Sequence, residues 1–218
     1  GVAAAIKQIN PRVKVYGVQA EGADAIARSY KAKRLISTDT ASTIADGIAV
    51  KSPGDITVDL INRYADGVVT VSDMEISSAI LLLMERCKQI VEPAGATPLA
   101  AVLSGKLDVK GKRVVCIMSG GNIDVSFVQS IIEQGLVARH RRIKFAVKLL
   151  DRPGSLEQLL HILASMSANI LTVQHDKLSQ GLNPNETTVS VACEVAGEEH
   201  GKAVMDALKA HGYTILMD

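Results

Sequence analysis

A hydroxyl, two glycines and an amide follow one another directly after an apolar run, since Ser119-Gly120-Gly121-Asn122 comes after residues 114–118. Glycine has no Cβ atom, so it lets the backbone turn sharply and lets a ligand approach closely. Asparagine fixes tight turns through local hydrogen bonds of its side chain. A ligand site and a plain turn between a strand and a helix both use these residue types. The stretch alone therefore leaves both interpretations open.

Two more motifs combine an acidic side chain with a residue that shapes the backbone. Glu92 stands directly before Pro93, where it either stabilises the first turn of a helix or points a carboxylate at a ligand. Gly47 follows Asp46, and Asp-Gly is a common turn pair. Each motif taken alone is compatible with a purely structural role and with ligand binding.

The elements that must position these motifs alternate between helix and strand over the first 138 residues. Helices are predicted at residues 2–9, 22–32, 56–64, 73–90, 93–104 and 124–137, the last ending near Gly135, and strands at 13–19, 67–71 and 112–118. Ser72 and Glu75 form a capping box at the start of the longest helix. Such alternation predicts a parallel or mixed sheet covered on both faces, with ligands bound beyond the carboxyl ends of its strands. Ser119 falls at such an end.

The character of the chain changes at the basic run 138–142, and a solvated linker is predicted at residues 139–142. Beyond it, strands are predicted at 143–150, 169–177, 186–195 and 213–217, a hairpin loop at 179–186, and helices at 155–166, capped by Ser155, and at 198–210. The order β-α-β-β-α-β is that of the ferredoxin-like unit. The open edges of such a small sheet favour pairing with a second copy.

Composition and charge bound the classes of partner. The chain has 218 residues, with 47% apolar and 22% charged, which is typical of a globular protein. A net charge of +1 and 3% aromatics argue against nucleic acid or an anionic membrane as a partner. We find no signal peptide and no apolar run of membrane length. Three scattered cysteines and five scattered histidines predict reduced thiols in a cytoplasmic protein and no metal site.

Three motifs in order resemble the C-terminal half of the catalytic domain of threonine dehydratases, pyridoxal-phosphate enzymes that also resemble serine racemase. They are Thr43-Ile44-Ala45-Asp46-Gly47, Val91-Glu92-Pro93-Ala94-Gly95-Ala96 and Ser119-Gly120-Gly121-Asn122-Ile123-Asp124. Residues 143–218 resemble an ACT domain, through the turn at 150–156 and the stretch at 168–170. The resemblance implies an α/β fold: the C-terminal part of a fold-type II (tryptophan synthase β-like) domain over residues 1–138, followed by a ferredoxin-like ACT domain.

The resemblance also implies a reaction and a cofactor. A threonine dehydratase converts L-threonine to 2-oxobutanoate and ammonia by β-elimination, with pyridoxal phosphate carrying the electronic part of the chemistry. The resemblance assigns Ser119 to the pyridine nitrogen, Gly120 to close approach of the ring, Gly47 to a backbone contact and Glu92 to the substrate or the ring hydroxyl. A hydroxyl beside the nitrogen leaves the ring mostly neutral, which favours prompt elimination over transamination.

Two parts of the family pattern match nothing in the chain. The Schiff-base lysine and the glycine-rich phosphate loop have no counterpart, and the helix at 2–9 begins without a cap, so we expect a truncated catalytic domain. No catalytic residue is therefore assigned, and the chain alone is expected to be inactive and not to bind the cofactor. Serine racemase-like relatives bind a divalent cation just after the strand at 13–19. Gln19 and Ala25 stand there, with Glu21 and Asp24 out of register, so no such metal site is predicted.

The ACT resemblance implies an amino-acid effector such as isoleucine or valine, bound between paired copies in a homo-oligomer. The residues it assigns to the effector are Asp151, Arg152, Gly154, Ser155, Leu156, Asn169 and Ile170. The alternative for the second domain is a dimerisation module without a ligand. Two wider alternatives also stay open: a regulatory module without catalysis, and a parent enzyme that dehydrates or racemises serine. The choice between isoleucine biosynthesis and threonine catabolism is open as well.

Overall fold

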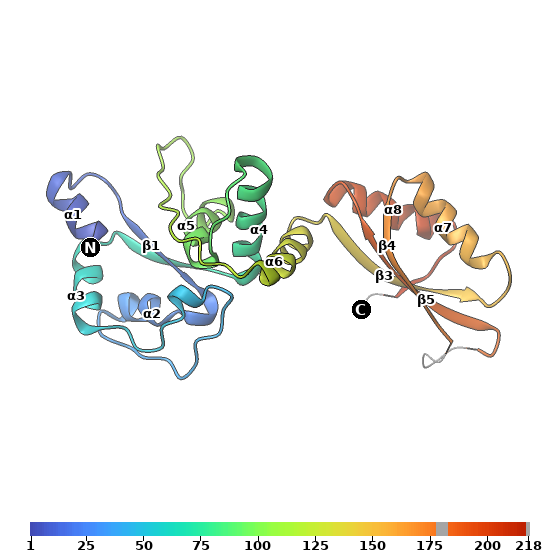
Figure 1. Ribbon diagram of the computed structural model, residues 1–218, viewed down its shortest axis with the longest axis horizontal. Coiled ribbons are helices and arrows are strands. Elements are labelled where there is room, and N and C mark those ends of the chain that lie inside the picture. Colours follow the sequence, from blue (N-terminus) through green and yellow to red (C-terminus); the bar gives the residue numbers. More distant parts are fainter. Residues whose placement is uncertain (178–182, 217–218) are drawn as a thin grey trace. The chain divides into compact units, whose positions relative to one another are not determined.

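The computed structural model describes residues 1–177 and 183–216. The chain divides into two compact units, Gly1–Gly135 and Leu136–Asp218, and each is described by itself (Figure 1). Residues 179–182 of the hairpin loop predicted at 179–186 lie outside the described residues, as does the last residue of the strand predicted at 213–217.

The first unit is built on a pair of parallel strands, β1 (Tyr16–Ala20) and β2 (Gly67–Val71), with Tyr16 opposite Gly67 and Ala20 opposite Val71. A parallel pair needs a long crossover, and the intervening chain supplies it with helical segments. These are η1 (Glu21–Ala23), α2 (Ala25–Ala32), η2 (Asp46–Ile48) and α3 (Asp55–Tyr64), while α1 (Val2–Ile9) precedes β1. Both strands end at one edge of the pair, so the loops that follow them begin side by side.

Helix α4 (Asp73–Leu82) begins as predicted and ends earlier than predicted. Its capping box is present, since Glu75 N–H donates to Ser72 Oγ at 3.2 Å and Ser72 N–H donates to the Glu75 carboxylate at 2.7 Å. The helix passes into a π-helical turn, η3 (Leu83–Cys87), and Lys88 ends it with a left-handed φ of 57°. The prediction of a helix to residue 90 was wrong, because the chain turns away there toward Pro93.

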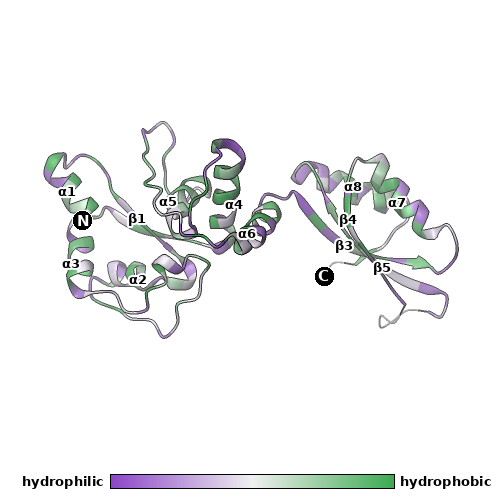
Figure 2. Ribbon diagram, viewed as in Figure 1, coloured by the Kyte–Doolittle hydropathy of each residue, from purple (hydrophilic) through white to green (hydrophobic). Residues whose placement is uncertain are grey.

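Helix α5 (Pro93–Leu103) starts on that proline, which suits the first position of a helix. Figure 2 shows α5 largely in the hydrophobic colour. Its small residues pack into the core of the first unit, which contains Ala20, Ala45, Val71, Ile76, Ala79, Ile80, Leu83, Val91, Ala96, Ala100, Ala101 and Ile131. Alanines at these positions let α4 and α5 approach closely.

The strand predicted at 112–118 does not form, because residues 113–124 belong to no helix or strand. The side chains of Val115 and Ile117 are 89% and 55% exposed, although a continuous apolar run is typical of a strand buried on both faces. A strand needs a neighbour to complete its hydrogen bonds, and among the described residues of this unit only β1 and β2 are paired as strands. The apolar pattern is typical of a strand, but no strand lies beside it among the described residues of this unit.

Helix α6 (Val125–Ala138) forms as predicted, but Gly135 lies inside it and not at its end. A Cβ atom on Gly135 would lie 2.8 Å from the carbonyl oxygen of Ser77 and 2.9 Å from Leu81 Cβ. The glycine therefore permits close packing on α4, which the sequence pattern could not distinguish from a helix stop.

The second unit has the predicted β-α-β-β-α-β order. Its elements are β3 (Arg142–Leu150), α7 (Ser155–Ser165), β4 (Asn169–Asp176), β5 (Glu186–Glu194), α8 (Glu198–Ala210) and β6 (Ile215–Leu216). The strands form an antiparallel sheet in the order β4-β5-β3-β6, so β4 is an edge strand. Ser155 was predicted to cap α7 but is its first helical residue. Gly154, with a φ of 90°, takes the cap position.

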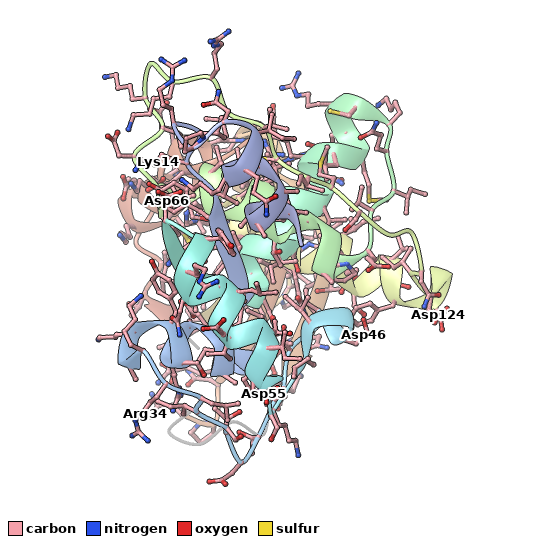
Figure 3. The ribbon with its side chains drawn as sticks, turned by 90° about the vertical axis from the view of Figure 1, so that its left-hand side faces the viewer. Lys14, Arg34, Asp46, Asp55, Asp66 and Asp124 are labelled. Atoms are coloured by element: carbon pink, nitrogen blue, oxygen red, sulfur yellow. The ribbon has the colours of Figure 1, made fainter. Side chains whose placement is uncertain are left out.

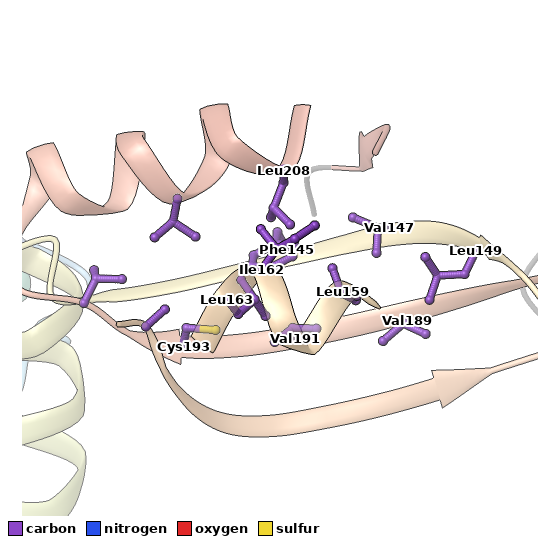
Figure 4. Close-up of a cluster of buried hydrophobic side chains, with 13 residues drawn as sticks. Phe145, Val147, Leu149, Leu159, Ile162, Leu163, Val189, Val191, Cys193 and Leu208 are labelled. Atoms are coloured by element: carbon purple, nitrogen blue, oxygen red, sulfur yellow. The ribbon is translucent and has the colours of Figure 1, made fainter. Parts of the chain in front are cut away.

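Alternating residues of β3 and β5 point to the helices and form the core of this unit (Figure 4). The core contains Phe145, Val147, Leu149, Leu159, Ile162, Leu163, Ala168, Val189, Val191, Cys193, Val195, Val204 and Leu208. Burial raises the pKa of the Cys193 thiol to about 11, so this cysteine behaves as a small apolar side chain.

Candidate functional site

The candidate site lies where β1 and β2 end, at their carboxyl edge. The chain continues from β1 into η1 and from β2 into the N-terminus of α4. Figure 3 shows Asp46 of η2 and Asp124 before α6 in the same unit. The carboxyl edge of a parallel strand pair is where α/β proteins bind ligands.

Gly47, Glu92 and Gly120 meet in one corner of the unit, although they are far apart in the sequence. A Cβ atom on Gly47 would lie 3.4 Å from Glu92 Oε1 and 3.2 Å from Ala94 Cβ. A Cβ atom on Gly120 would lie 2.1 Å from the carboxyl carbon of Glu92. The Glu92 carboxylate therefore lies against both glycines, and at Gly120 it fills space that any other residue would need.

Ser119 joins this corner through its backbone. A Cβ atom on Gly95 would lie 1.7 Å from the carbonyl oxygen of Ser119 and 3.0 Å from its nitrogen, so the first turn of α5 touches the Ser119 backbone. Glu92 N–H donates to the carbonyl of Gly120 at 3.4 Å, and Asn122 N–H donates to Glu92 Oε2 at 3.2 Å. The structure thus gathers all four residues that were predicted to face the cofactor.

Three residues of this corner were not assigned to the site from the sequence. Gly95 and Ala94 belong to the motif around Glu92, and Asn122 belongs to the motif after Ser119, so the signal was their membership of those motifs. Their contacts depend on the approach of α5 to residues 119–122, which no local pattern encodes. Asp124, the last residue of its motif, accepts Ser126 N–H at 2.9 Å. This bond lowers the pKa of Asp124 and makes it a cap of α6.

The residues of the corner fit the ring end of pyridoxal phosphate. Ser119 offers an exposed hydroxyl, which suits a neutral pyridine nitrogen. Because Gly47 and Gly120 lack a Cβ atom on the side where Glu92 lies, their backbones come close to its carboxylate. Glu92 supplies a carboxylate between the two glycines. These four would hold the ring, and the cofactor would supply the electron sink for a carbanion.

The residues predicted to bind an effector fall at two ends of the second unit. Asp151, Arg152, Ser155 and Leu156 line a small hollow of about 30 Å³ together with Leu149, Leu150, His175, Thr187 and Val189. Asp151 accepts a hydrogen bond from Lys177 Nζ at 2.7 Å, which lowers the pKa of Asp151. Gly154 lines a different, wider hollow of about 530 Å³, with Glu157, Gln158, His161, Ile162, His211 and Tyr213, which the sequence did not single out.

Asn169 and Ile170 do not line the small hollow. They begin β4 and lie opposite Glu194 and Cys193 of β5, whereas His175, near the other end of β4, lines it. A strand of eight residues spans about 23 Å. Within one copy, the two groups of predicted effector residues are therefore far apart.

The positions considered for a cation have other partners. Gln19 Oε1 accepts Ala27 N–H at 2.8 Å, and Asp24 accepts both its bonds from Arg28. Over residues 1–177 and 183–216, no group of three or more His, Cys, Asp or Glu side chains is arranged to hold a metal ion. Over the same residues, no helix has the length and apolar character needed to cross a membrane.

Comparison with known proteins shows the family of the chain. Residues 1–120, more than half of the chain, match the sequence profile of the family described as "Pyridoxal-phosphate dependent enzyme". The chain is 42% identical over 99% of its length to an L-threonine ammonia-lyase of Thermotoga maritima, and covers 53% of that protein. It therefore spans about half the length of the curated relatives it matches.

Two solved structures are similar to it. The processed form of threonine deaminase isoform 2 from Solanum lycopersicum is 31% identical with a TM-score of 0.56, over 61% of this chain and 39% of that one. Maize serine racemase is 33% identical with a TM-score of 0.55, over 64% of this chain and 44% of that one. The chain belongs to the pyridoxal-phosphate-dependent enzyme family.

Proposed function

We propose that the chain is the C-terminal part of the catalytic domain of a threonine ammonia-lyase, followed by an ACT domain that senses an amino acid. The observation that carries this proposal is the convergence of Ser119, Gly47, Gly120 and Glu92 on one corner at the carboxyl edge of β1 and β2. The curated relative that is 42% identical is named an L-threonine ammonia-lyase, which supports threonine as the substrate.

In the proposed reaction L-threonine loses its Cα proton and its β-hydroxyl, and hydrolysis of the product gives 2-oxobutanoate and ammonia. Pyridoxal phosphate supplies the electron sink when it is bound. The Ser119 hydroxyl would hydrogen-bond the pyridine nitrogen without protonating it, because its own pKa is far too high for proton transfer. Gly47 and Gly120 would bound the ring, and Glu92 would orient the groups at its hydroxyl side.

A chimera tests this proposal directly, with the chain replacing the matching 53% of the Thermotoga maritima enzyme. We expect 2-oxobutanoate and ammonia from threonine, and a lower kcat/KM for serine. Ser119→Ala should lose activity, whereas Ser126→Ala, which changes a serine of α6, should not. Racemisation or dehydration of serine with no turnover of threonine would favour the serine-acting alternative. A folded chimera that binds the cofactor and converts neither amino acid would overturn the proposal.

For the second unit, we infer that the effector site is shared between two copies. The hollow beside Asp151 has a volume of about 30 Å³, which is room for about one water molecule and not for an amino acid. The edge strand β4 exposes Leu171 and Val173, and antiparallel pairing of two β4 edges would place the start of one strand beside the end of the other. Asn169 and Ile170 of the second copy would then approach this hollow.

The pairing and the ligand are tested on the 218-residue chain. We expect a dimer in sedimentation equilibrium and binding of isoleucine or valine in calorimetric titration. The double variant Leu171→Lys with Val173→Lys should be monomeric and should lose amino-acid binding, whereas Thr172→Lys should retain both, because it leaves the apolar pair in place. A dimer that binds neither amino acid would leave a dimerisation module. Monomer over a wide concentration range would overturn the shared site.

A regulatory module without catalysis makes a distinct forecast. In that case the chimera would remain inactive on threonine and serine, and the 218-residue chain would still bind isoleucine or valine. The two sets of measurements therefore separate the catalytic part of the proposal from its regulatory part.

A further inference from the structure

The loop that carries Gly47 is held at two places, both at the carboxyl edge of the strand pair. It crosses from residue 42 to η2, and Gly47 lies in the middle of η2. Gly47 lies next to the Glu92 carboxylate, so the path of this loop sets the distance between Gly47 and Glu92 in the candidate site.

The first anchor is Gly22, just after β1. Ser42 N–H donates to the carbonyl of Gly22 at 2.9 Å, and a Cβ atom on Gly22 would lie 1.8 Å from the carbonyl oxygen of Ser42. The loop therefore starts in direct backbone contact with the end of β1.

The second anchor is Asp73, two residues after β2. Its Oδ1 accepts the Thr43 hydroxyl, and its Oδ2 accepts Ile44 N–H at 3.1 Å. Thr43 Oγ1 in turn accepts Ala45 N–H at 3.1 Å, and Ala45 is fully buried. The two carboxylate oxygens thus hold two consecutive loop residues, Thr43 and Ile44. The Thr43 hydroxyl in turn fixes the backbone of Ala45, two residues before Gly47.

We propose that Asp73 is a positioning residue of the cofactor site: its carboxylate fixes the loop at Thr43 and Ile44, and so places Gly47 against Glu92. The inference rests on the proposed function for its consequence at the cofactor, and on the hydrogen bonds alone for its geometry. Asp73 itself bonds the loop and not the corner formed by Gly47, Glu92 and Gly120.

The contact suits a carboxyl side chain, because the Thr43 hydroxyl and Ile44 N–H each meet a separate oxygen. Two donors converge on the two oxygens, so an asparagine would turn its own N–H₂ toward either the Thr43 hydroxyl or Ile44 N–H. Asp73 is also the first residue of α4, where a negative charge is favoured by the helix dipole. A purely helical role is the competing explanation, and the chain contains a control for it in Asp55, which is likewise the first residue of its helix, α3.

The first test measures amide hydrogen exchange in the 218-residue chain. Asp73→Asn and Thr43→Val should accelerate exchange at Ile44 and Ala45 about tenfold or more, the loss expected for one charge-assisted hydrogen bond, and should shift the amide resonance of Gly47. Thr43→Ser keeps the hydroxyl and should behave as the unsubstituted chain. Asp55→Asn should leave residues 43–47 unchanged. Unchanged exchange at 44–45 and an unmoved Gly47 resonance in Asp73→Asn would overturn the proposal.

The second test measures cofactor affinity in the Thermotoga maritima chimera. Asp73→Asn should raise the dissociation constant of pyridoxal phosphate about tenfold relative to Asp55→Asn, with kcat changed far less at saturating cofactor. Equal affinity in the two variants would overturn the role at the cofactor. If the unsubstituted chimera has no activity, the proposed function fails, while the exchange measurement still decides whether Asp73 places Gly47.

Discussion

The Cβ atom that Gly95 lacks would lie 1.7 Å from the carbonyl oxygen of Ser119. This distance is far shorter than any van der Waals contact, so the first turn of α5 and the strand-end motif can meet only if residue 95 is glycine. The contact joins two motifs that are 24 residues apart, and it makes the position of Ser119 depend on α5.

Gly95→Ala should therefore destabilise the first unit by about 1 to 3 kcal/mol, as overpacking of a close contact does. Alanine is the better helix former by about 1 kcal/mol, so propensity alone predicts the opposite sign. Gly201→Ala in α8 is the control, because its Cβ atom would meet only side-chain carbons, the nearest at 3.3 Å. Urea unfolding of the three proteins measures the difference. Equal stability of Gly95→Ala and the unsubstituted chain would contradict the contact.

Neighbouring glycines in the Ser119 motif should respond differently to alanine. Gly120 has a φ of 77° and its Cβ atom would lie 2.1 Å from the Glu92 carboxyl carbon, whereas a Cβ atom on Gly121 would meet nothing within 4 Å. Gly120→Ala should cost roughly 1 to 2 kcal/mol in backbone strain alone and should displace Glu92 from Asn122 N–H. In the chimera it should abolish cofactor binding, while Gly121→Ala should retain it. Absorbance titration with pyridoxal phosphate distinguishes them, and equal affinities would show that the Glu92 contact is dispensable.

Asp66 joins the start of β1 to the end of α3, and its stability contribution should depend on pH. Its carboxylate lies 2.7 Å from Lys7 Nζ and 3.0 Å from Lys14 Nζ, and accepts Val15 N–H at 2.8 Å (Figure 3). The hydrogen bond from Lys7 lowers the pKa of Asp66 well below its usual range. A carboxyl group with a lowered pKa stabilises the fold at pH values above its unfolded-state pKa of about 3.9. This stabilisation is lost as the pH falls toward the pKa of the folded state.

Asp66→Asn should accordingly lower the free energy of unfolding by about 1 to 3 kcal/mol at neutral pH, and by progressively less as the pH falls below about 4. Asp108→Asn is the matched control, since Asp108 pairs with Lys112 on the surface, where the two side chains are 85% and 58% exposed. It should leave stability unchanged. Denaturation between pH 7 and pH 2 tests both variants, and a pH-independent loss in Asp66→Asn would contradict the role of the charge.

His200 ties the start of α8 to the end of α7 in the second unit. Its Nδ1 accepts Ala196 N–H at 3.0 Å, so Nε2 carries the proton and donates to the Met166 carbonyl at 2.7 Å. His200→Ala should destabilise this unit by about 1 to 2 kcal/mol, because two backbone groups lose their partners. His200→Gln should retain part of the lost stability, since a side-chain amide both donates and accepts hydrogen bonds. Exposed His161 provides the control, and His161→Ala should unfold at the denaturant concentration of the unsubstituted chain.

Local chemistry predicted much of the fold. The Ser72–Glu75 capping box, Pro93 at the start of α5 and the alternation of β3 are each decided within a few residues, and each formed as expected. The errors share a different cause. Residues 112–118 need a strand beside them. A glycine is needed at 135 because Ser77 lies close to it, and α4 passes into a π-helical turn that ends at Lys88. These three features depend on contacts with residues that are distant in the sequence, which a local pattern does not encode.

The candidate site divides in the same way. Gly47, Glu92, Ser119 and Gly120 were assigned to the site through the resemblance to threonine dehydratases, which rests on three short motifs in order. Asp73 escaped notice because its position is that of an ordinary acidic residue at a helix start, and its partners, Thr43 and Ile44, lie about 30 residues earlier. Only the folded loop reveals that both of its oxygens are occupied.

The apolar stretch at 114–118 has a consequence for handling the chain in solution. Backbone donors and acceptors that are not in a sheet, flanked by the exposed side chains of Val114, Val115, Ile117 and Met118, form a template on which another extended chain can add. We therefore expect the chain to associate as its concentration rises, despite its ordinary overall composition. Replacing Val115, the most exposed of the four, with a charged residue should reduce this association.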